Sequence, residues 1–560
     1  MIFRVKQGTF MRSTFSFLVI ILSFIFTGLI KAEFASELGK QFDNPLMPQS
    51  LPYGEVTPTS QKAEKSPTMM GKNFLLLDAR VEDAPEGVML EPFLAEIKGK
   101  KVTFAMLKEQ AQAMTRYLRD EGFLLSQVIL PPQKVQGGQV RFQVINGFID
   151  RVVFDGEVDV LNDSMKKMLR DLTKQKPLQR ETLESVLLLV AETPGVDIQV
   201  AFKASETTQS ASDLTVTVKK DWGSALVGAN NENRRELGPW QGYAGLTLNN
   251  LFDDYGRVNL VAAHALDSQK SQHVGIDYET FLTDDGLKLV MDLQHNQTKP
   301  GGTLAVLRSK NTFTAFKAGV KYPFILGRHE RLDGELMIKT SENETNTRSI
   351  GLVKVDHLRT LHAGLKYDVA DHWGGANVMT MSMTQGISGF LGASQNQSTR
   401  KVRANSRYDF FKMNAEAVRT QTVDDNLSAI FHVQGQLGTT TLPSSQKFYF
   451  GASQSNKGYE MSVLGADSAL NGTVGLSYML PSELGVTRLF TNIGQGCAWI
   501  RRPSADEKHH TTLASMDFGL DHAIQEINGV FNMVYGHPLK KRLFGQKAKQ
   551  RFYVGIRFNL

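Results

Sequence analysis

Residues 445–459 read SQKFYFGASQSNKGY, and this stretch is the most informative part of the chain. It begins as a strand end and closes on a tip of one cation, one glycine and one aromatic ring: Lys457, Gly458 and Tyr459. Gly458 permits a backbone turn that residues with a Cβ atom resist. Lys457 carries a single positive charge on a long stem, and Tyr459 adds an amphipathic ring. Such a tip in a long loop, late in a large β-protein, predicts a latch that finds a partner inside a barrel.

The first 32 residues have the pattern of a secretory signal peptide. An apolar run, Phe15–Ile30, follows three cations, and a small residue, Ala32, completes a plausible cleavage site. The alternative is a single N-terminal anchor helix, for which the run is short. After residue 30, no apolar run approaches the ~20 residues that a membrane helix needs.

The composition favours an exported β-protein. Of the 560 residues, 41% are hydrophobic, and glycine (48) and phenylalanine (33) are frequent. The single cysteine, Cys497, excludes an intrachain disulfide scaffold. The net charge of +6 is mild and spread out, so we expect no nucleic-acid partner. This profile is typical of a soluble periplasmic protein or of an outer-membrane barrel.

Residues 33–72 are expected to form an irregular leader. Five prolines interrupt this polar stretch and break any long helix: Pro45, Pro48, Pro52, Pro58 and Pro67. Only Ala35–Phe42 has the pattern of a short helix.

Residues 73–147 show the order strand, helix, strand, strand. Phe74–Val81 is the first predicted strand. Thr103 is placed to cap a helix that runs through Asp120 and buries one apolar face, and Gly122 ends it. The two later strands are Ser126–Leu130 and Gln139–Ile145, the second with clear alternation of apolar and polar residues.

Residues 148–220 repeat this order with a second helix added. The predicted strands are Ile149–Phe154, Val196–Phe202 and Leu214–Val218. Asn162 is placed to cap a helix that reaches Leu172, and Arg180–Glu192 forms the other helix.

From residue 221 to 560 the pattern changes to segments of about ten residues that alternate apolar and polar side chains. Gly242–Leu248, Val258–Ala265 and Phe552–Phe558 are examples. Such segments predict a closed transmembrane antiparallel β-barrel with lipid outside and a wet lumen inside. We count about sixteen strands, about eleven before a long loop at about 440–470 and about five after it. Short and long connections alternate, as periplasmic turns and extracellular loops do.

The last strand has the offsets of an outer-membrane insertion signal, with Tyr553, Gly555, Phe558 and Leu560 at the key positions. The alternative is an ordinary amphipathic final strand. Between the last two strands lies a cluster of basic residues: Lys540, Lys541, Arg542, Lys547 and Lys549. This cluster either contacts lipopolysaccharide phosphates or is a solvated loop.

No grouping of residues indicates catalysis, a cofactor or a metal, so we expect no enzymatic activity. His509 and His510 are adjacent, and their rings would point to opposite faces of a strand. Cys497 lacks the basic neighbours of a reactive thiol. Asp253-Asp254 and Asp284-Asp285 lack calcium-ligand spacing and are interpreted as turns.

The stretch 445–459 resembles the lumen loop of two-partner secretion transporters (the TpsB group, which includes the ShlB/FhaC/HecB-like haemolysin secretion/activation proteins and is related to BamA). Their loop is close to S-E-x-F-x-L-G-G-x-x-S-V-R-G-Y, so Lys457 replaces the usual Arg and Asn456 the usual Val. In that family the loop Arg meets the Asp of an F-x-D motif. Here the motif is Phe490-Thr491-Asn492, so the resemblance implies a weaker Lys457–Asn492 latch.

The two units before the barrel resemble POTRA domains, and their sequence motifs are similar to those of the TpsB group. Gly122 through Pro131 and Gln133 matches the family's G-Y…P-x-Q, and Gly147 lies in its E-G-x-I junction. For Gly122 and Gly147 the ordinary interpretation is a turn or core role.

The resemblance implies an outer-membrane protein of a Gram-negative bacterium, with POTRA domains in the periplasm. It implies export of one large partner exoprotein without nucleotide hydrolysis, the partner binding the POTRA domains and the lumen. Outer-membrane lipid or lipopolysaccharide, the barrel assembly machinery and periplasmic chaperones are the other expected partners. A BamA-type assembly factor is the alternative function, and a passive porin or haem-uptake channel is a third. The cargo, whether haemolysin, adhesin, contact-dependent toxin or haem-acquisition protein, stays open.

Overall fold

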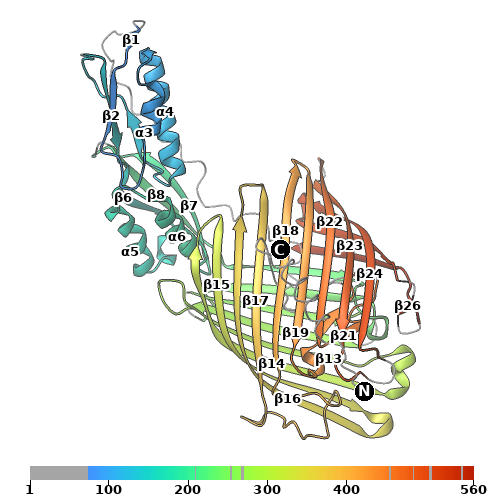
Figure 1. The fold of residues 1–560 in the computed structure, drawn as a ribbon. Helices are drawn as coiled ribbons and strands as arrows, with labels where there is room; N and C mark the ends of the chain where they lie inside the picture. Colours follow the sequence, from blue (N-terminus) through green and yellow to red (C-terminus); the bar gives the residue numbers. More distant parts are fainter. Residues whose placement is uncertain are drawn as a thin grey trace, which may run out of the picture. The chain divides into compact units, whose positions relative to one another are not determined.

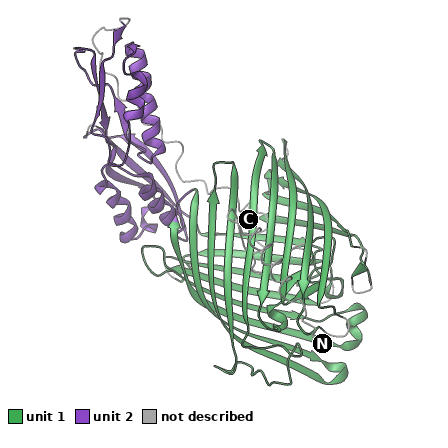
Figure 2. Cartoon of the chain, viewed as in Figure 1, with its two compact units in different colours: residues 1–48, 222–325, 329–560 green, residues 49–221, 326–328 purple. Residues whose placement is uncertain are grey.

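The computed structural model describes residues 73–560 except 136, 209, 253–254, 267–269, 453–455, 483–484, 504–506, 541 and 544–545. The predicted signal peptide, the leader with its short helix, the Asp253-Asp254 turn and Lys541 lie outside the described residues. Two compact units divide the rest: residues 73–221 with 326–328 form one, and residues 222–325 with 329–560 form the other (Figure 2). Within the described residues, none of the helices is long and apolar enough to cross a membrane.

The smaller unit holds two α+β layers in succession. In the first, the three-stranded sheet has the order β2 (Asp78–Glu82), β5 (Gln139–Ile145), β4 (Gln127–Ile129), with β2 parallel and β4 antiparallel to β5. A second, two-stranded sheet pairs β1 (Phe74–Leu75) with β3 (Lys101–Val102).

Helix α4 (Phe104–Asp120) forms as the sequence predicts. The Thr103 hydroxyl accepts a hydrogen bond from the backbone N–H of Met106 at 3.2 Å and caps the helix. Its buried face is the expected apolar stripe of Leu107, Ala111, Met114 and Leu118. These side chains join Phe142 and Val144 of β5 in one core.

One helix in this layer was not predicted. Helix α3 (Glu91–Ile97) carries Pro92 in its first turn and buries Ile97. A proline is compatible with a helix at that position because the first N–H groups have no intrahelical acceptor. The first layer therefore has two helices, as the second does.

In the second layer the sheet order is β6 (Phe148–Gly156), β8 (Ala211–Lys220), β7 (Val196–Ala204). The predicted helices form as α5 (Asp163–Asp171) and α6 (Arg180–Ala191). The Asn162 side chain caps α5 by accepting from the N–H of Met165 at 2.6 Å. Strands β5 and β8 are central in their sheets, which leaves β2, β4, β6 and β7 as edges.

The larger unit is a closed antiparallel barrel of sixteen strands, as predicted (Figure 1). Eleven strands precede the long loop and five follow it. The strands are β9 (Gly223–Asn230), β10 (Gln241–Asn249), β11 (Gly256–Ala265), β12 (Ser271–Phe281), β13 (Lys288–Thr298), β14 (Ser309–Leu326), β15 (Glu330–Thr347), β16 (Leu352–Ala370), β17 (Gly375–Ile387), β18 (Phe411–Asp424), β19 (Leu427–Gly438), β22 (Ser468–Ser482), β23 (Gly485–Trp499), β24 (His510–Ile524), β25 (Gly529–Pro538) and β28 (Arg551–Asn559).

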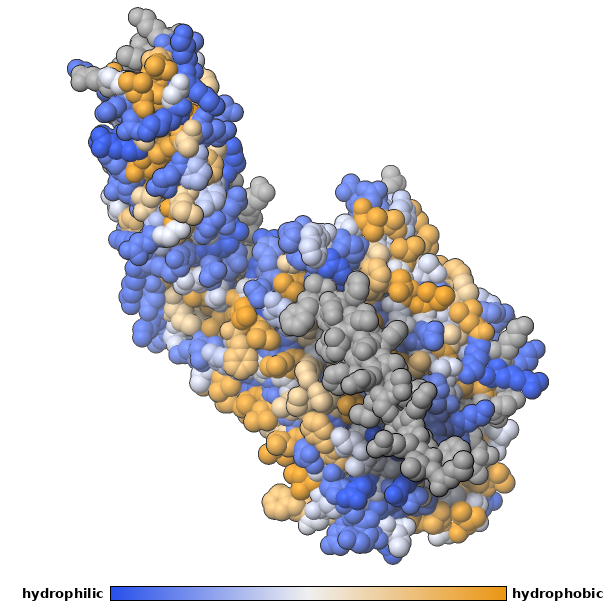
Figure 3. Space-filling model, viewed as in Figure 1, coloured by the Kyte–Doolittle hydropathy of each residue, from blue (hydrophilic) through white to orange (hydrophobic). Residues whose placement is uncertain are grey.

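Closure occurs between the first and last strands, where Gly555 pairs with Asn230 and Asn559 with Leu226. Closing the sheet removes the unpaired edges that hydrocarbon cannot satisfy. Along β15, Leu336 and Ile338 face outward and are 52% and 63% exposed, whereas Asp333 and Ser341 are buried. Hydrophobic residues accordingly gather on the barrel wall in Figure 3.

Candidate functional site: a loop tip on the lumen wall

The long loop between β19 and β22 carries a small hairpin. Strands β20 (Phe448–Phe450) and β21 (Leu464–Ala466) pair antiparallel, with Phe448 opposite Ala466. Phe450, Leu464 and Ala466 are buried in one cluster with Ala498 and Leu513. The last two residues belong to β23 and β24, so the hairpin packs against the inner wall of the barrel.

Tyr459 anchors the tip of the loop. Its side chain is 3% exposed, and its hydroxyl donates to the carbonyl of Ala514 at 3.0 Å and to that of Lys540 at 3.3 Å. Burial raises the pKa of the Tyr459 phenol, which keeps it a donor. The hydroxyl of Tyr553 on β28 in turn donates to the Tyr459 carbonyl at 3.0 Å. Strands β24 and β28 and the connection that follows β25 therefore all hold Tyr459.

Gly458 is needed for close approach and not for an unusual turn. Its φ is not among the positive ones, whereas Asn456, two residues earlier, is left-handed at φ 60°. A Cβ atom on Gly458 would lie 2.6 Å from the carbonyl carbon of His537 on β25. A Cβ atom on Gly536 would lie 2.2 Å from the Lys457 carbonyl oxygen. The loop and β25 thus touch backbone to backbone, and the special turn predicted at Gly458 lies at Asn456 instead.

The sequence predicted a pair between Lys457 and Asn492, but among the described residues each has another partner. The Asn492 amide donates to the Asp517 carboxylate at 2.7 Å, its cross-strand neighbour on β24. The Lys457 ammonium lies 5.9 Å from the ring centroid of Phe490. Among the described residues, Lys457 takes part in no ion pair. The acidic group of the site is therefore Asp517, one strand further along the wall.

Phe490 and Asn492 point into the lumen because they alternate with outward residues such as Leu489 and Ile493, which are 43% and 55% exposed. Asp517 was missed because the sequence motif covers one strand only. A usable signal was present: Asp517 and Asp521 recur at even spacing in a membrane strand, and charged side chains there face the lumen.

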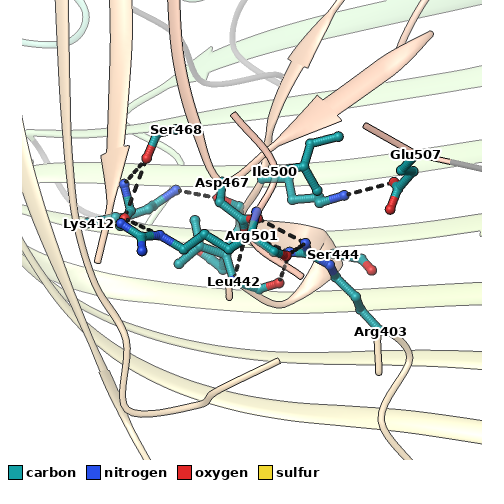
Figure 4. A network of polar contacts seen from close by, with 12 residues as sticks. Arg403, Lys412, Leu442, Ser444, Asp467, Ser468, Ile500, Arg501 and Glu507 are labelled. Carbon is teal, nitrogen blue, oxygen red and sulfur yellow. Dashed lines mark hydrogen bonds and ion pairs between the residues drawn. The ribbon is translucent and has the colours of Figure 1, made fainter. Parts of the chain in front are cut away.

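Beside the tip, a buried ion pair joins three connections of the barrel (Figure 4). Asp467, fully buried, accepts two hydrogen bonds from Arg403, from Nη1 at 2.5 Å and from Nη2 at 2.9 Å. It also accepts from the backbone N–H groups of Leu442 and Arg501, both at 2.7 Å. Arg403 completes the cluster by donating to the carbonyls of the same two residues.

The POTRA residues singled out from the sequence make hydrogen bonds or close backbone contacts within the smaller unit. The Gln133 side chain pairs with the Arg141 backbone in two hydrogen bonds, of 2.7 and 2.8 Å, and donates to the Pro131 carbonyl at 3.3 Å. Gly122 has φ 96° and accepts from the N–H of Arg180, the first residue of α6. A Cβ atom on Gly147 would lie 2.1 Å from the Leu125 carbonyl oxygen.

The residues of the expected insertion signal divide between the two faces of β28. Phe558 and Leu560 share the outward face with Phe552, which is 52% exposed. Tyr553 and Gly555 face inward, and Tyr553 is 5% exposed because it holds the loop. Among the described residues, no group of three or more His, Cys, Asp or Glu side chains could hold a metal ion.

A closed antiparallel barrel that follows two α+β layers, with a loop tip docked on its lumen wall, is the architecture expected of a protein that joins POTRA domains to a membrane barrel. The family model described as "POTRA domain, ShlB-type" matches residues 81–147, and the model "Haemolysin secretion/activation protein ShlB/FhaC/HecB" matches residues 209–522. The chain belongs to this ShlB/FhaC/HecB family of haemolysin secretion/activation proteins.

Curated relatives and solved structures agree with the family. The chain is 21% identical over 502 residues to the "Heme/hemopexin transporter protein HuxB" of Haemophilus influenzae strain 86-028NP, covering 85% of this chain and 86% of the relative. It resembles CdiB from Escherichia coli with a TM-score of 0.67 and 16% identity over 90% of this chain and 94% of that one. A BamA structure from Haemophilus ducreyi reaches 0.53 with 14% identity, covering 87% of this chain and 100% of that one.

The protein is thus a two-partner secretion transporter of the outer membrane, with its POTRA region in the periplasm, and its partner is a secreted exoprotein. The likeness to BamA is weaker than the likeness to the transporters, so the assembly-factor alternative is not favoured. Its family is one of transporters and not of enzymes.

Proposed function

We propose that the structure is a resting state in which the loop tip occupies the lumen wall and must leave it for the exoprotein to pass. The observation that carries this proposal is the kind of contact that holds the tip. Tyr459 and Asn456 are held by hydrogen bonds, Lys457 lies over the Phe490 ring, and the next residue, Glu460, forms one partly exposed ion pair with Arg551 of β28 at 2.8 Å. Hydrogen bonds of this kind contribute about 0.5–1.5 kcal/mol each, so they order the tip and still release it.

The exoprotein enters through the periplasmic layers. Edge strands β2, β4, β6 and β7 leave backbone groups for an extended segment to join by strand addition. An unfolded segment then moves to the lumen, where polar side chains such as Asp517 and Asn492 face the passage. Folding of the exoprotein outside the cell supplies the direction, and no nucleotide is consumed.

For the cargo, we propose a haem- or haemopexin-acquisition exoprotein as the first candidate, since the relative from Haemophilus influenzae is a haem/haemopexin transporter. Co-expression of the transporter with such an exoprotein, and with an adhesin and a haemolysin of the same secretion type, compares the candidates. Release of the adhesin or the haemolysin alone would reject the haem assignment.

Movement of the loop is tested by locking it. The only cysteine, Cys497, is first replaced by serine. Asn456 Nδ2 and Asn471 Oδ1 lie 2.6 Å apart, so cysteines at these positions face each other, and Asn456→Cys with Asn471→Cys, bridged by a short reagent that forms a disulfide with each thiol, joins the tip to β22. A control pair, Tyr449→Cys with Gly465→Cys, joins opposite residues of the β20–β21 hairpin and leaves the tip free.

The cross-linked 456–471 protein should stop export and recover it with a reductant, while the control pair exports throughout. Normal export by the cross-linked 456–471 protein, with the cross-link verified by mass spectrometry, would reject the displacement of the tip. It would leave the family assignment untouched.

A further inference from the structure

A row of aromatic side chains crosses the outer face of the last three strands. Phe518 of β24 pairs in register with Tyr535 of β25, and Tyr535 pairs with Phe552 of β28. These side chains are 47%, 37% and 52% exposed. Aromatic girdles of this kind mark the level where a membrane barrel meets the lipid headgroups.

The row lies toward the cell-surface end of the barrel. Strand β9 follows the POTRA region and begins at Gly223, and strand β28 finishes at Asn559 beside it, so that end is periplasmic. Arg551, at the other end of β28, is one residue from Phe552. The connection that joins β25 to β28 therefore emerges next to the outer leaflet.

That connection carries exposed cations on a small hairpin made of β26 and β27 (Figure 1). Strands β26 (Arg542–Leu543) and β27 (Gln546–Lys547) pair so that Arg542 lies directly opposite Lys547. Like charges placed opposite each other across a strand pair repel. Among the described residues, neither cation has an acidic partner within ion-pair distance. The two exposed cations are thus positioned to share one anionic group.

Neighbouring contacts fix this hairpin in place. Leu543 is 7% exposed and packs in the cluster that contains Phe450 and Tyr459. Lys540, just before the hairpin, donates from Nζ to the carbonyl of Thr512 at 2.8 Å and to its hydroxyl at 3.2 Å. Lys549, just after it, is exposed. The cations are therefore presented from an anchored segment.

We propose that this surface binds a phosphorylated glycolipid of the outer leaflet, a lipopolysaccharide. Its phosphate groups bridge Arg542 and Lys547 with Lys549 beside them, and its acyl chains lie along Phe518, Tyr535 and Phe552. Guanidinium and ammonium groups donate charge-assisted hydrogen bonds to phosphate oxygens. In the alternative, a solvated loop, only water and counter-ions screen the repulsion between Arg542 and Lys547. An acidic segment of the exoprotein is the competing occupant.

The test uses the full-length protein purified in detergent and titrated with bisphosphorylated lipid A, dephosphorylated lipid A or inorganic phosphate, with bound lipid counted by native mass spectrometry. The test variant is Arg542→Gln, Lys547→Gln, Lys549→Gln. The matched control, Lys101→Gln, Lys108→Gln, Lys167→Gln, removes the same charge from exposed positions in the POTRA region.

The wild-type and control proteins should bind one bisphosphorylated lipid A in preference to the dephosphorylated form. The test variant should lose about tenfold in affinity, the sum of three exposed ion pairs. Unchanged lipid binding by the test variant, or equal binding of the two lipids, would overturn the proposal. Inorganic phosphate that binds as tightly as bisphosphorylated lipid A would overturn it too. Export lost in the variant with lipid binding intact would assign the surface to the exoprotein.

Discussion

Arg403 and Asp467 form a two-point ion pair between the β17–β18 connection and the residue that precedes β22, 64 positions apart in the sequence. Asp467 is fully buried and also holds the backbone of Leu442 and Arg501. One carboxylate therefore joins three connections at the same end of the barrel. Figure 4 shows the side chains converging on it.

We predict that Asp467→Asn loosens these connections. The substitution leaves the guanidinium of Arg403 without its counter-charge in a buried site, which costs about 3–5 kcal/mol. Limited proteolysis of residues 388–410 and 439–467 in outer-membrane vesicles should become faster. The double variant Arg403→Met with Asp467→Asn removes both charges, keeps an acceptor oxygen for the backbone N–H groups, and should be less affected than Asp467→Asn alone. Additive effects of the two substitutions would show that the pair does not act as one unit.

A charge swap tests the Lys457 site. Asn492→Asp alone places a second carboxylate against Asp517, and Asp517→Asn alone removes the carboxylate that accepts from Asn492. Each single variant should therefore impair export at a normal amount of inserted protein. The double variant Asn492→Asp with Asp517→Asn restores one carboxylate and one amide and should recover most of the export. If the double variant exports no better than the worse single variant, the position of the charge has no role.

Lys457→Ala removes the cation itself. Its ammonium lies over the Phe490 ring, so a moderate loss of loop stability is expected, about 0.5–1 kcal/mol if the pair is exposed to water and more where water is excluded. Protease sensitivity of the loop should rise and export should fall, while Lys457→Arg keeps both close to normal. Equal behaviour of the Ala and Arg variants would reject a role for the charge.

Gly458→Ala tests the backbone contact between the loop and β25. The added methyl group would lie 2.6 Å from the His537 backbone, so the tip must move away from the wall. Faster cleavage of the loop and a larger single-channel conductance in planar bilayers are the expected results. Gly472→Ala is the matched control, because nothing lies within 4 Å of a Cβ atom at that position. Equal conductance in both variants would show that close packing at Gly458 does not hold the tip on the wall.

Deletion of residues 73–147 should leave an inserted barrel and abolish export. All sixteen barrel strands lie outside the deletion, whereas the edges β2 and β4 are lost with it. Heat-modifiable mobility on gels reports barrel folding, and secreted exoprotein in the medium reports export. Normal secretion by the shortened protein would remove this layer from partner recognition.

The sequence by itself determined the periodic features of this protein. Alternation of side chains predicted sixteen strands and their division around the long loop, because a barrel strand in a bilayer must be apolar on one side only. The capping residues Thr103 and Asn162 located α4 and α5, since each satisfies N–H groups that the helix leaves unpaired. Helix α3 was not predicted, and Pro92 is compatible with its first turn.

Only the tertiary structure decided which side chains meet across the barrel. The motif placed Lys457 against Asn492, but strand pairing brings Asp517 beside Asn492 from 25 positions away and makes it the acidic group. The same holds for Tyr553, which belongs to the last strand and holds the loop through Tyr459. Periodicity fixes which face a residue takes, because it is a local property of the backbone. Contacts between distant strands depend on register and closure, which no single stretch of sequence contains.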